Sequence, residues 1–168
     1  MKLYIALDNV RSLHNVGAIM RTALGFELDG LFTIGVTPHP RLTHDTRLPH
    51  VIAKAERAIQ KTALGGEVLF LNHFQSANEL TSWAVEKDLA IISLEKTENS
   101  VLLADFTANG DTVLVVGSET EGVSRDILLA SSRVLHIPIS PQKESYNVAT
   151  SAGIAMYALH AQFAKLQS

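Results

Sequence analysis

The chain has 168 residues, of which 46% are hydrophobic, and this length suits one domain with a substantial core. It has no cysteine, which excludes disulfides, thiolate metal sites, cysteine nucleophiles and cysteine-bound iron–sulfur clusters. The net charge of −3 argues weakly against nucleic-acid binding. However, residues 1–61 carry +3 and residues 62–168 carry −6, so a local basic face is compatible with the total.

Strand and helix patterns alternate along the chain. In order, they predict a strand at 3–7, a helix that ends near Gly25, a strand at 31–36, a polar loop at 37–50 and a helix at 51–62. A strand at 68–74, a helix from Ser76 to about Asp88 and strands at 89–94 and 112–117 follow. The last elements are a helix over 124–131, a strand at 134–139 and a helix over 148–165.

The predicted strands are apolar on both faces, which favours an α/β fold. Such strands form a mostly parallel sheet that is covered by helices on both faces. No apolar run approaches the roughly 18–20 residues that span a bilayer, and Asp8 interrupts the N-terminal apolar run too early for a secretory signal. We therefore expect one cytoplasmic domain over residues 1–168.

Three turns that follow apolar strands carry unusual polar groups, at residues 8–15, 117–124 and 140–147. In parallel sheets, ligands bind beyond the carboxyl ends of the strands. In the first turn, Asn15 is a candidate helix cap, Gly17 permits close approach of another group, and Arg21 lies two turns from the helix start. A lone arginine of this kind is more often simply solvated; its combination with asparagine and glycine favours function.

The second turn contains Gly117, Glu119, Glu121 and Gly122. It lacks the lysine of a phosphate-binding loop and the dinucleotide fingerprint, and its carboxylates would repel phosphate. A cationic or hydroxyl-rich ligand suits it, although a glycine turn with exposed acids is an equal alternative when the turn is considered alone.

The third turn places Ser145, Tyr146 and Asn147 at a helix entrance, where unpaired backbone N–H groups add further donors. The simpler alternative is that Asn147 caps the helix and its neighbours are solvated. Elsewhere, His39, His44 and His50 have irregular spacing within the 37–50 loop, which favours solvated or RNA-facing residues over metal ligands. Trp83 is expected in the core.

Together, the three turns resemble the motifs of the SpoU (TrmH-like) branch of the SPOUT RNA methyltransferases. The first motif, N-x-G-x-x-x-R, corresponds to Asn15, Gly17 and Arg21. The second, G-x-E-x-x-G, corresponds to Gly117, Glu119 and Gly122. The third, I-P-[MI] followed by S-x-N, corresponds to Ile137, Pro138, Ile139, Ser145 and Asn147.

The resemblance implies transfer of methyl from S-adenosylmethionine to a ribose 2′-hydroxyl of tRNA or rRNA, without a metal. It also implies a trefoil knot at about residues 112–168. The implied catalytic residues are Arg21, Asn15, Glu119, Ser145 and Asn147. The implied cofactor-binding residues are Leu94, Gly117, Ile137, Ile139, Ser145 and Tyr146.

Arg21 is expected to bind the acceptor phosphate rather than act as a base, because arginine does not lose its proton in proteins. We expect a homodimer with a shared RNA site, no separate RNA-binding domain, and RNA contacts from Arg11, Arg41 and Arg47. Apolar residues Ile154, Met156 and Leu166 favour the dimer, since they lie off the main stripe of the last helix. The alternatives are a catalytically inactive SPOUT-fold RNA-binding module and a nucleotide-dependent oxidoreductase; the missing glycine fingerprint counts against the latter.

Overall fold

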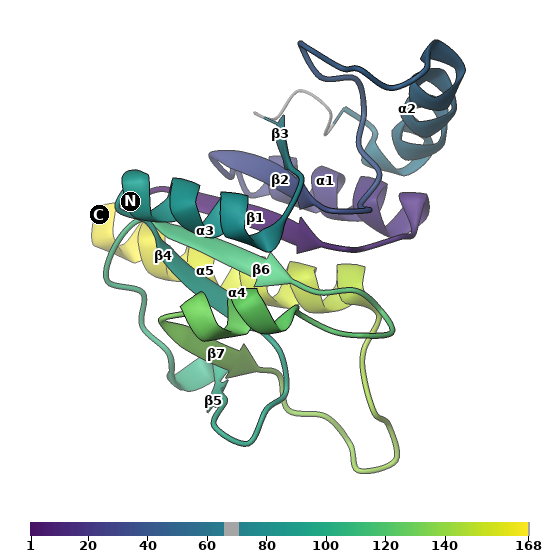
Figure 1. The fold of residues 1–168 in the computed structure, drawn as a ribbon. Helices are drawn as coiled ribbons and strands as arrows, with labels where there is room; N and C mark the ends of the chain where they lie inside the picture. The colour runs from purple at the N-terminus through teal and green to yellow at the C-terminus, as the bar shows by residue number, and fades with distance from the viewer. Residues whose placement is uncertain (66–70, 168) are drawn as a thin grey trace.

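The computed structural model describes residues 1–65 and 71–167, the backbone alone for residues 164–167. Its strands form one seven-stranded sheet in the order β3-β2-β1-β6-β4-β7-β5, and every pairing is parallel (Figure 1). The strands are β1 (Leu3–Asp8), β2 (Gly30–Ile34), β3 (Leu71–Phe74), β4 (Ala90–Leu94), β5 (Val101–Leu102), β6 (Thr112–Val116) and β7 (Arg133–His136). The helices are α1 (Leu13–Gly25), α2 (Pro49–Ala63), α3 (Ala77–Glu86), α4 (Arg125–Ala130) and α5 (Val148–Gln167), with a 3₁₀ turn at Leu103–Asp105.

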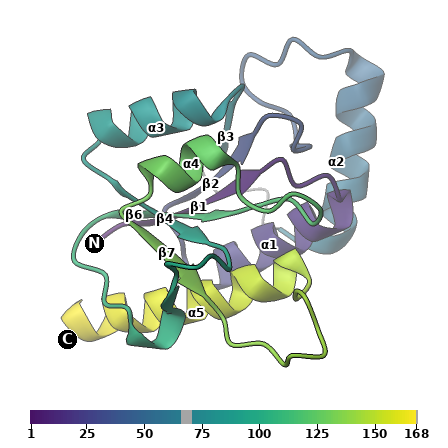
Figure 2. The ribbon, with the colours of Figure 1, turned by 60° about the horizontal axis from the view of Figure 1, so that its bottom comes forward.

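Helices cover both faces of the sheet, which confirms the predicted α/β fold (Figure 2). One core contains residues of α1 and α5, and the other contains residues of α3 and α4. Strand β6 carries a continuous run of apolar residues because both of its faces are buried. Leu114 and Val116 belong to the first core, whereas Val113 and Val115 belong to the second. A strand that is buried on both faces has no polar side to alternate with.

The predicted elements are found, with informative differences at their ends. Residues 68–70 of the predicted third strand lie outside the described residues. The sequence analysis missed β5, because two exposed residues at the sheet edge leave no periodic pattern. Ser124 precedes α4 as predicted, but its side chain makes no capping bond. None of the described helices has the length and hydropathy to cross a membrane.

Strand β7 lies between β4 and β5, although it follows both in the chain. The chain therefore returns between segments that are already placed, and α5 then packs on the opposite face from α4 (Figure 2). This order is compatible with the trefoil knot, which stays a prediction.

The 37–50 loop is partly held by buried polar contacts, and one prediction about it needs correction. His39 is not solvated: it is 5% exposed and stacks on His73 with ring centroids 4.4 Å apart. Arg47 is half-buried, and its guanidinium donates to Asp45 and to the carbonyl oxygens of His39 and Pro40. The Arg47 guanidinium thus closes the loop on itself, and it holds the pKa of Asp45 well below its usual range. The contact of Arg47 with RNA stays a prediction.

Burial lowers the pKa of both His39 and His73 below the ordinary value of 6.5, and the Arg47 charge lowers them further. The unfolded chain therefore binds protons on these residues at a pH where the folded chain does not. The free energy of unfolding is consequently expected to be highest above pH 6.5 and to fall as the pH drops below it.

Chemical denaturation at neutral and mildly acidic pH measures this dependence. The double variant His39→Phe/His73→Phe keeps two stacked rings and should reduce the loss in acid, whereas the exposed His44→Phe should not. If the free energy of unfolding of the double variant falls in acid as steeply as that of the wild type, His39 and His73 do not cause the pH dependence.

Candidate active site

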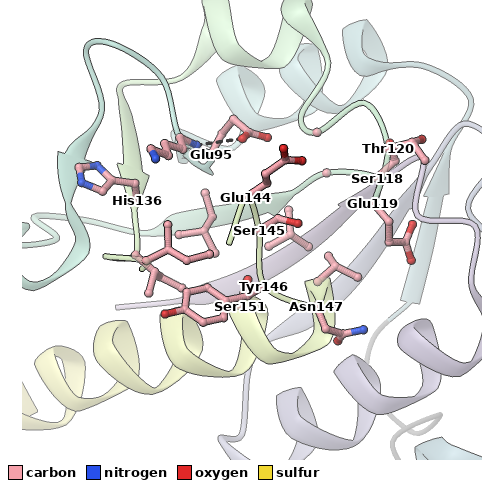
Figure 3. Close-up of a pocket in the computed structure, with 18 of the residues that line it drawn as sticks. Glu95, Ser118, Glu119, Thr120, His136, Glu144, Ser145, Tyr146, Asn147 and Ser151 are labelled. Carbon is pink, nitrogen blue, oxygen red and sulfur yellow. Dashed lines mark hydrogen bonds between the residues drawn. The ribbon is translucent and has the colours of Figure 1, made fainter. Parts of the chain in front are cut away.

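A cavity of about 700 Å³ opens at the carboxyl ends of β4, β6 and β7, beside the entrance to α5 (Figure 3). Each strand ends in one of its walls, as parallel sheets generally arrange their ligand sites. The second and third turns that the sequence singled out both line this cavity. All six residues predicted to bind a cofactor are among its lining: Leu94, Gly117, Ile137, Ile139, Ser145 and Tyr146.

A chain of side-chain hydrogen bonds joins the three turns. Asn15 Nδ2 donates to Glu119 Oε1 at 2.7 Å. Asn147 Nδ2 in turn donates to Asn15 Oδ1 at 3.2 Å, and Asn147 Oδ1 accepts the N–H groups of Ala149 and Thr150. Asn147 therefore caps α5, which confirms the simpler interpretation, and it also lines the cavity.

Asn15 is not the cap of α1, as the sequence suggested. Ser12 is the cap, and its hydroxyl accepts the Asn15 N–H at 3.3 Å. The carboxamide of Asn15 is thereby left for Glu119 and Asn147. It is 9% exposed, although it lies within hydrogen-bonding reach of two turns more than a hundred residues away.

Gly117 and Gly122 shape the second turn. A Cβ on Gly117 would overlap the backbone of Gly122 and Val123, so the turn closes only with glycine there. Gly122 has φ +70, a left-handed conformation that favours glycine. Ser118 pairs with Gly122 through both backbone bonds, and its hydroxyl accepts the Glu121 N–H.

Sequence reasoning missed Glu95 and His136, which also line the cavity. Glu95 accepts the Val123 N–H at 3.1 Å and so ties the end of β4 to the second turn. The sequence feature that could have indicated Glu95 is its position directly after an apolar strand. His136 Nδ1 is buried without a hydrogen-bond partner among the described residues. Figure 3 shows these two residues at one end of the cavity, and Glu119 and Asn147 at the other.

Other predicted residues lie outside the cavity lining. Gly17 packs on α2, where a Cβ would overlap Thr62 and the Ile59 carbonyl, so the group that approaches it is a helix and not a ligand. Arg21 is exposed and lies about 120° around α1 from Asn15. Within the described part of the chain it forms no hydrogen bond or ion pair. Arg11 and Arg41 are also exposed, and Arg41 pairs with Glu56 at 3.5 Å.

The cavity is lined by more acid than base. Its carboxylates are Glu95, Glu119, Glu121 and Glu144, and its basic side chains are Lys96 and His136. Such a lining suits a ligand with positive charge and disfavours one that carries several phosphates. Within residues 1–65 and 71–167, no cluster of His, Asp or Glu side chains could hold a metal ion.

Comparisons with known proteins find similar sequences and the same fold. An uncharacterised tRNA/rRNA methyltransferase of Mycobacterium bovis is 30% identical over 160 residues, which are 95% of this chain and 45% of that protein. The AdoMet complex of the SpoU methyltransferase AviRb from Streptomyces viridochromogenes has a TM-score of 0.77 at 21% identity, covering 97% of this chain and 58% of that chain. A structure that concerns 2-OH methylation of C/U34 on tRNA has a TM-score of 0.70 at 19% identity, covering 98% of this chain and 97% of that chain.

The chain spans about half the length of the curated relatives it matches. The model of the SpoU rRNA Methylase family matches residues 2–157, which include all three motifs. The chain belongs to the SpoU rRNA Methylase family.

Proposed function

We propose that the chain transfers methyl from S-adenosylmethionine to a ribose 2′-hydroxyl of tRNA or rRNA. The observation that carries this proposal is the hydrogen-bonded chain Glu119–Asn15–Asn147 at the mouth of a cofactor-sized cavity. The AdoMet-bound neighbour and the neighbour concerned with 2-OH methylation support it. We further propose that residues 1–168 act as one cytoplasmic methyltransferase domain, knotted at about residues 112–168.

The residues present fit S-adenosylmethionine. Leu94, Ile137 and Ile139 offer apolar surface beside exposed backbone groups of the last turn, as a planar base requires. The carboxylates suit the positive charges of the sulfonium and the amino group. The unpartnered His136 Nδ1 supplies a polar contact that the folded chain alone leaves unsatisfied.

The cofactor supplies a methyl group on a positively charged sulfur, so the protein has little covalent chemistry to perform. Positioning is then the main contribution. Asn15 and Asn147 hold the Glu119 carboxylate at the edge of the cavity. Ser145 is exposed beside them and is available to the acceptor ribose. Arg21, which stays charged, binds the acceptor phosphate and stabilises negative charge that develops on the 2′-oxygen.

We propose a homodimer, because Arg21 does not line the cavity of its own chain. The surface of α5 near the end of α1 is apolar: Ile154 is 40% exposed and Tyr157 is 64% exposed, and the Tyr157 ring lies 6.2 Å from the Phe26 ring at a tilt of 49°. Two of the residues expected to favour a dimer do not support it. Met156 is fully buried within its own chain, and the side chain of Leu166 lies outside the described residues.

Cofactor binding is expected to need neither RNA nor metal. Calorimetry in EDTA should detect S-adenosylmethionine, and Gly117→Ala should abolish the heat because its Cβ displaces the Gly122 backbone. Gly110→Ala is the matched control, since a Cβ there meets nothing within 4 Å. Binding of NAD in place of S-adenosylmethionine would exclude the proposal, and cofactor binding without any methyl transfer to RNA would favour the inactive RNA-binding module.

A further inference from the structure

Helix α2 carries a row of basic side chains on its solvent side. The helix buries Ile52, Ala55, Ile59 and Ala63. At 100° per residue, the basic residues fall within an arc of about 60° on the opposite side. We call this row the α2 basic face; it consists of His50, Lys54, Arg57 and Lys61, all of them exposed.

This arrangement opposes helix stability, because like charges three or four residues apart repel each other. Glu56, the acidic residue of α2, lies off the row and pairs with Arg41. Across the described residues, Lys54, Arg57 and Lys61 form no ion pair, and Arg57 donates instead to the Ala53 carbonyl of its own helix. A chain with a net charge of −3 thus gathers unpaired positive charge on one helix, which indicates an anionic partner.

The α2 basic face is rigidly placed relative to the candidate active site. Gly17 lets α1 and α2 approach closely, since a Cβ on it would overlap the Thr62 hydroxyl and the Ile59 carbonyl oxygen. Thr62, next to Lys61, donates its hydroxyl to the His14 carbonyl at 3.3 Å. The residue after His14 is Asn15, which holds Glu119. Figure 1 shows α2 beside α1 at the margin of the molecule, away from the sheet.

We propose that the α2 basic face binds the phosphate backbone of the RNA substrate and sets its register on the active site. This inference rests on the proposed function. The row extends about 16 Å along the helix, which is long enough to contact several consecutive phosphates. Such contacts supply affinity and orientation without reading sequence. An anionic membrane is a poorer partner, because interfacial helices bury an apolar face in the lipid and α2 already buries its own in the protein.

The test measures binding of labelled bulk tRNA over a range of salt concentrations. The triple variant Lys54→Ala/Arg57→Ala/Lys61→Ala is expected to weaken binding and to reduce the slope of log K against log salt by roughly two to three units, at about 0.7–0.9 per lost phosphate contact. Calorimetric cofactor binding should stay at the wild-type level, because no residue of α2 lines the cavity, whereas methyl transfer to tRNA should fall. Replacement of the same three residues by the other basic side chain (Lys→Arg and Arg→Lys) should retain the salt slope.

The control is the triple variant Lys2→Ala/Lys87→Ala/Arg133→Ala. It removes the same charge at the amino ends of the strands, far from the cavity, and all three residues are exposed. A loss of tRNA binding that is confined to the α2 triple variant supports the inference, even if no methyl transfer is found. The test therefore distinguishes failure of the proposed function from failure of the proposed RNA-binding surface. Equal losses in both triples, or none, overturn the inference. The inference is also overturned if the wild-type protein binds phosphatidylglycerol vesicles and the α2 triple variant loses this binding but keeps tRNA binding.

Discussion

Arg21→Ala is expected to reduce methyl transfer by about 10²–10³-fold, the usual cost of removing one donor that stabilises developing charge. Its affinity for S-adenosylmethionine should stay within a few-fold of wild type, because Arg21 does not line the cavity where the cofactor is proposed to bind. Single-turnover methylation of tRNA and calorimetry separate the two effects. Folding should be unaffected, since the side chain is exposed.

Two further substitutions make this prediction specific. Arg21→Lys keeps the charge but loses the planar fork that grips phosphate with two donors, so it should recover part of the activity. Arg133→Ala removes an exposed arginine at the amino end of β7 and should leave transfer unchanged. Full activity of Arg21→Ala would exclude any role for this residue in the transfer.

The sequence predicted the cavity well because its walls are the ends of strands. Apolar segments that were predicted to end at Gly117 and Ile139 show where a parallel sheet stops, and polar residues beyond such ends meet at one edge. The resemblance then assigned these residues to a cofactor. Even so, Glu95 went unnoticed: its contact with the Val123 N–H joins segments 28 residues apart, and no local spacing encodes it.

The remaining errors concern side chains whose partners are distant or unexpected. A cap for α1 was assigned to Asn15, but the hydroxyl three residues earlier takes that position and releases the carboxamide for the site. Arg47 was expected only as an RNA contact, and its hydrogen bonds to Asp45 and to two carbonyl groups were not foreseen. In each case a polar side chain had several possible partners, and only the fold decides which one is close.

The position of Arg21 also bears on assembly. On α1 it precedes Thr22, whose methyl group lies near Gly153 of α5. Ile154 follows on α5, 40% exposed. A second copy that covers this apolar surface would bring its own Arg21 toward the partner subunit's cavity. In the proposed dimer, Arg21 would thus act at the cavity of the partner subunit, since it does not line the cavity of its own chain.

The sharpest consequence is complementation between two inactive chains. Arg21→Ala and Glu119→Ala should each be inactive as homodimers. If Arg21 acts across the interface, a heterodimer has one site with both changes and one site with neither. A randomly exchanged mixture should therefore regain about one quarter of wild-type activity.

The matched control pairs Asn15→Ala with Glu119→Ala, which affect the same hydrogen bond within one subunit. Each site of that heterodimer keeps one defect, so no activity should return. Light scattering establishes the dimer, and two different affinity tags show that subunits exchange. If tagged Arg21→Ala and Glu119→Ala chains form heterodimers that stay inactive, Arg21 serves the cavity of its own chain. The acceptor would then have to bridge from the exposed side of α1 to Glu119 within one subunit.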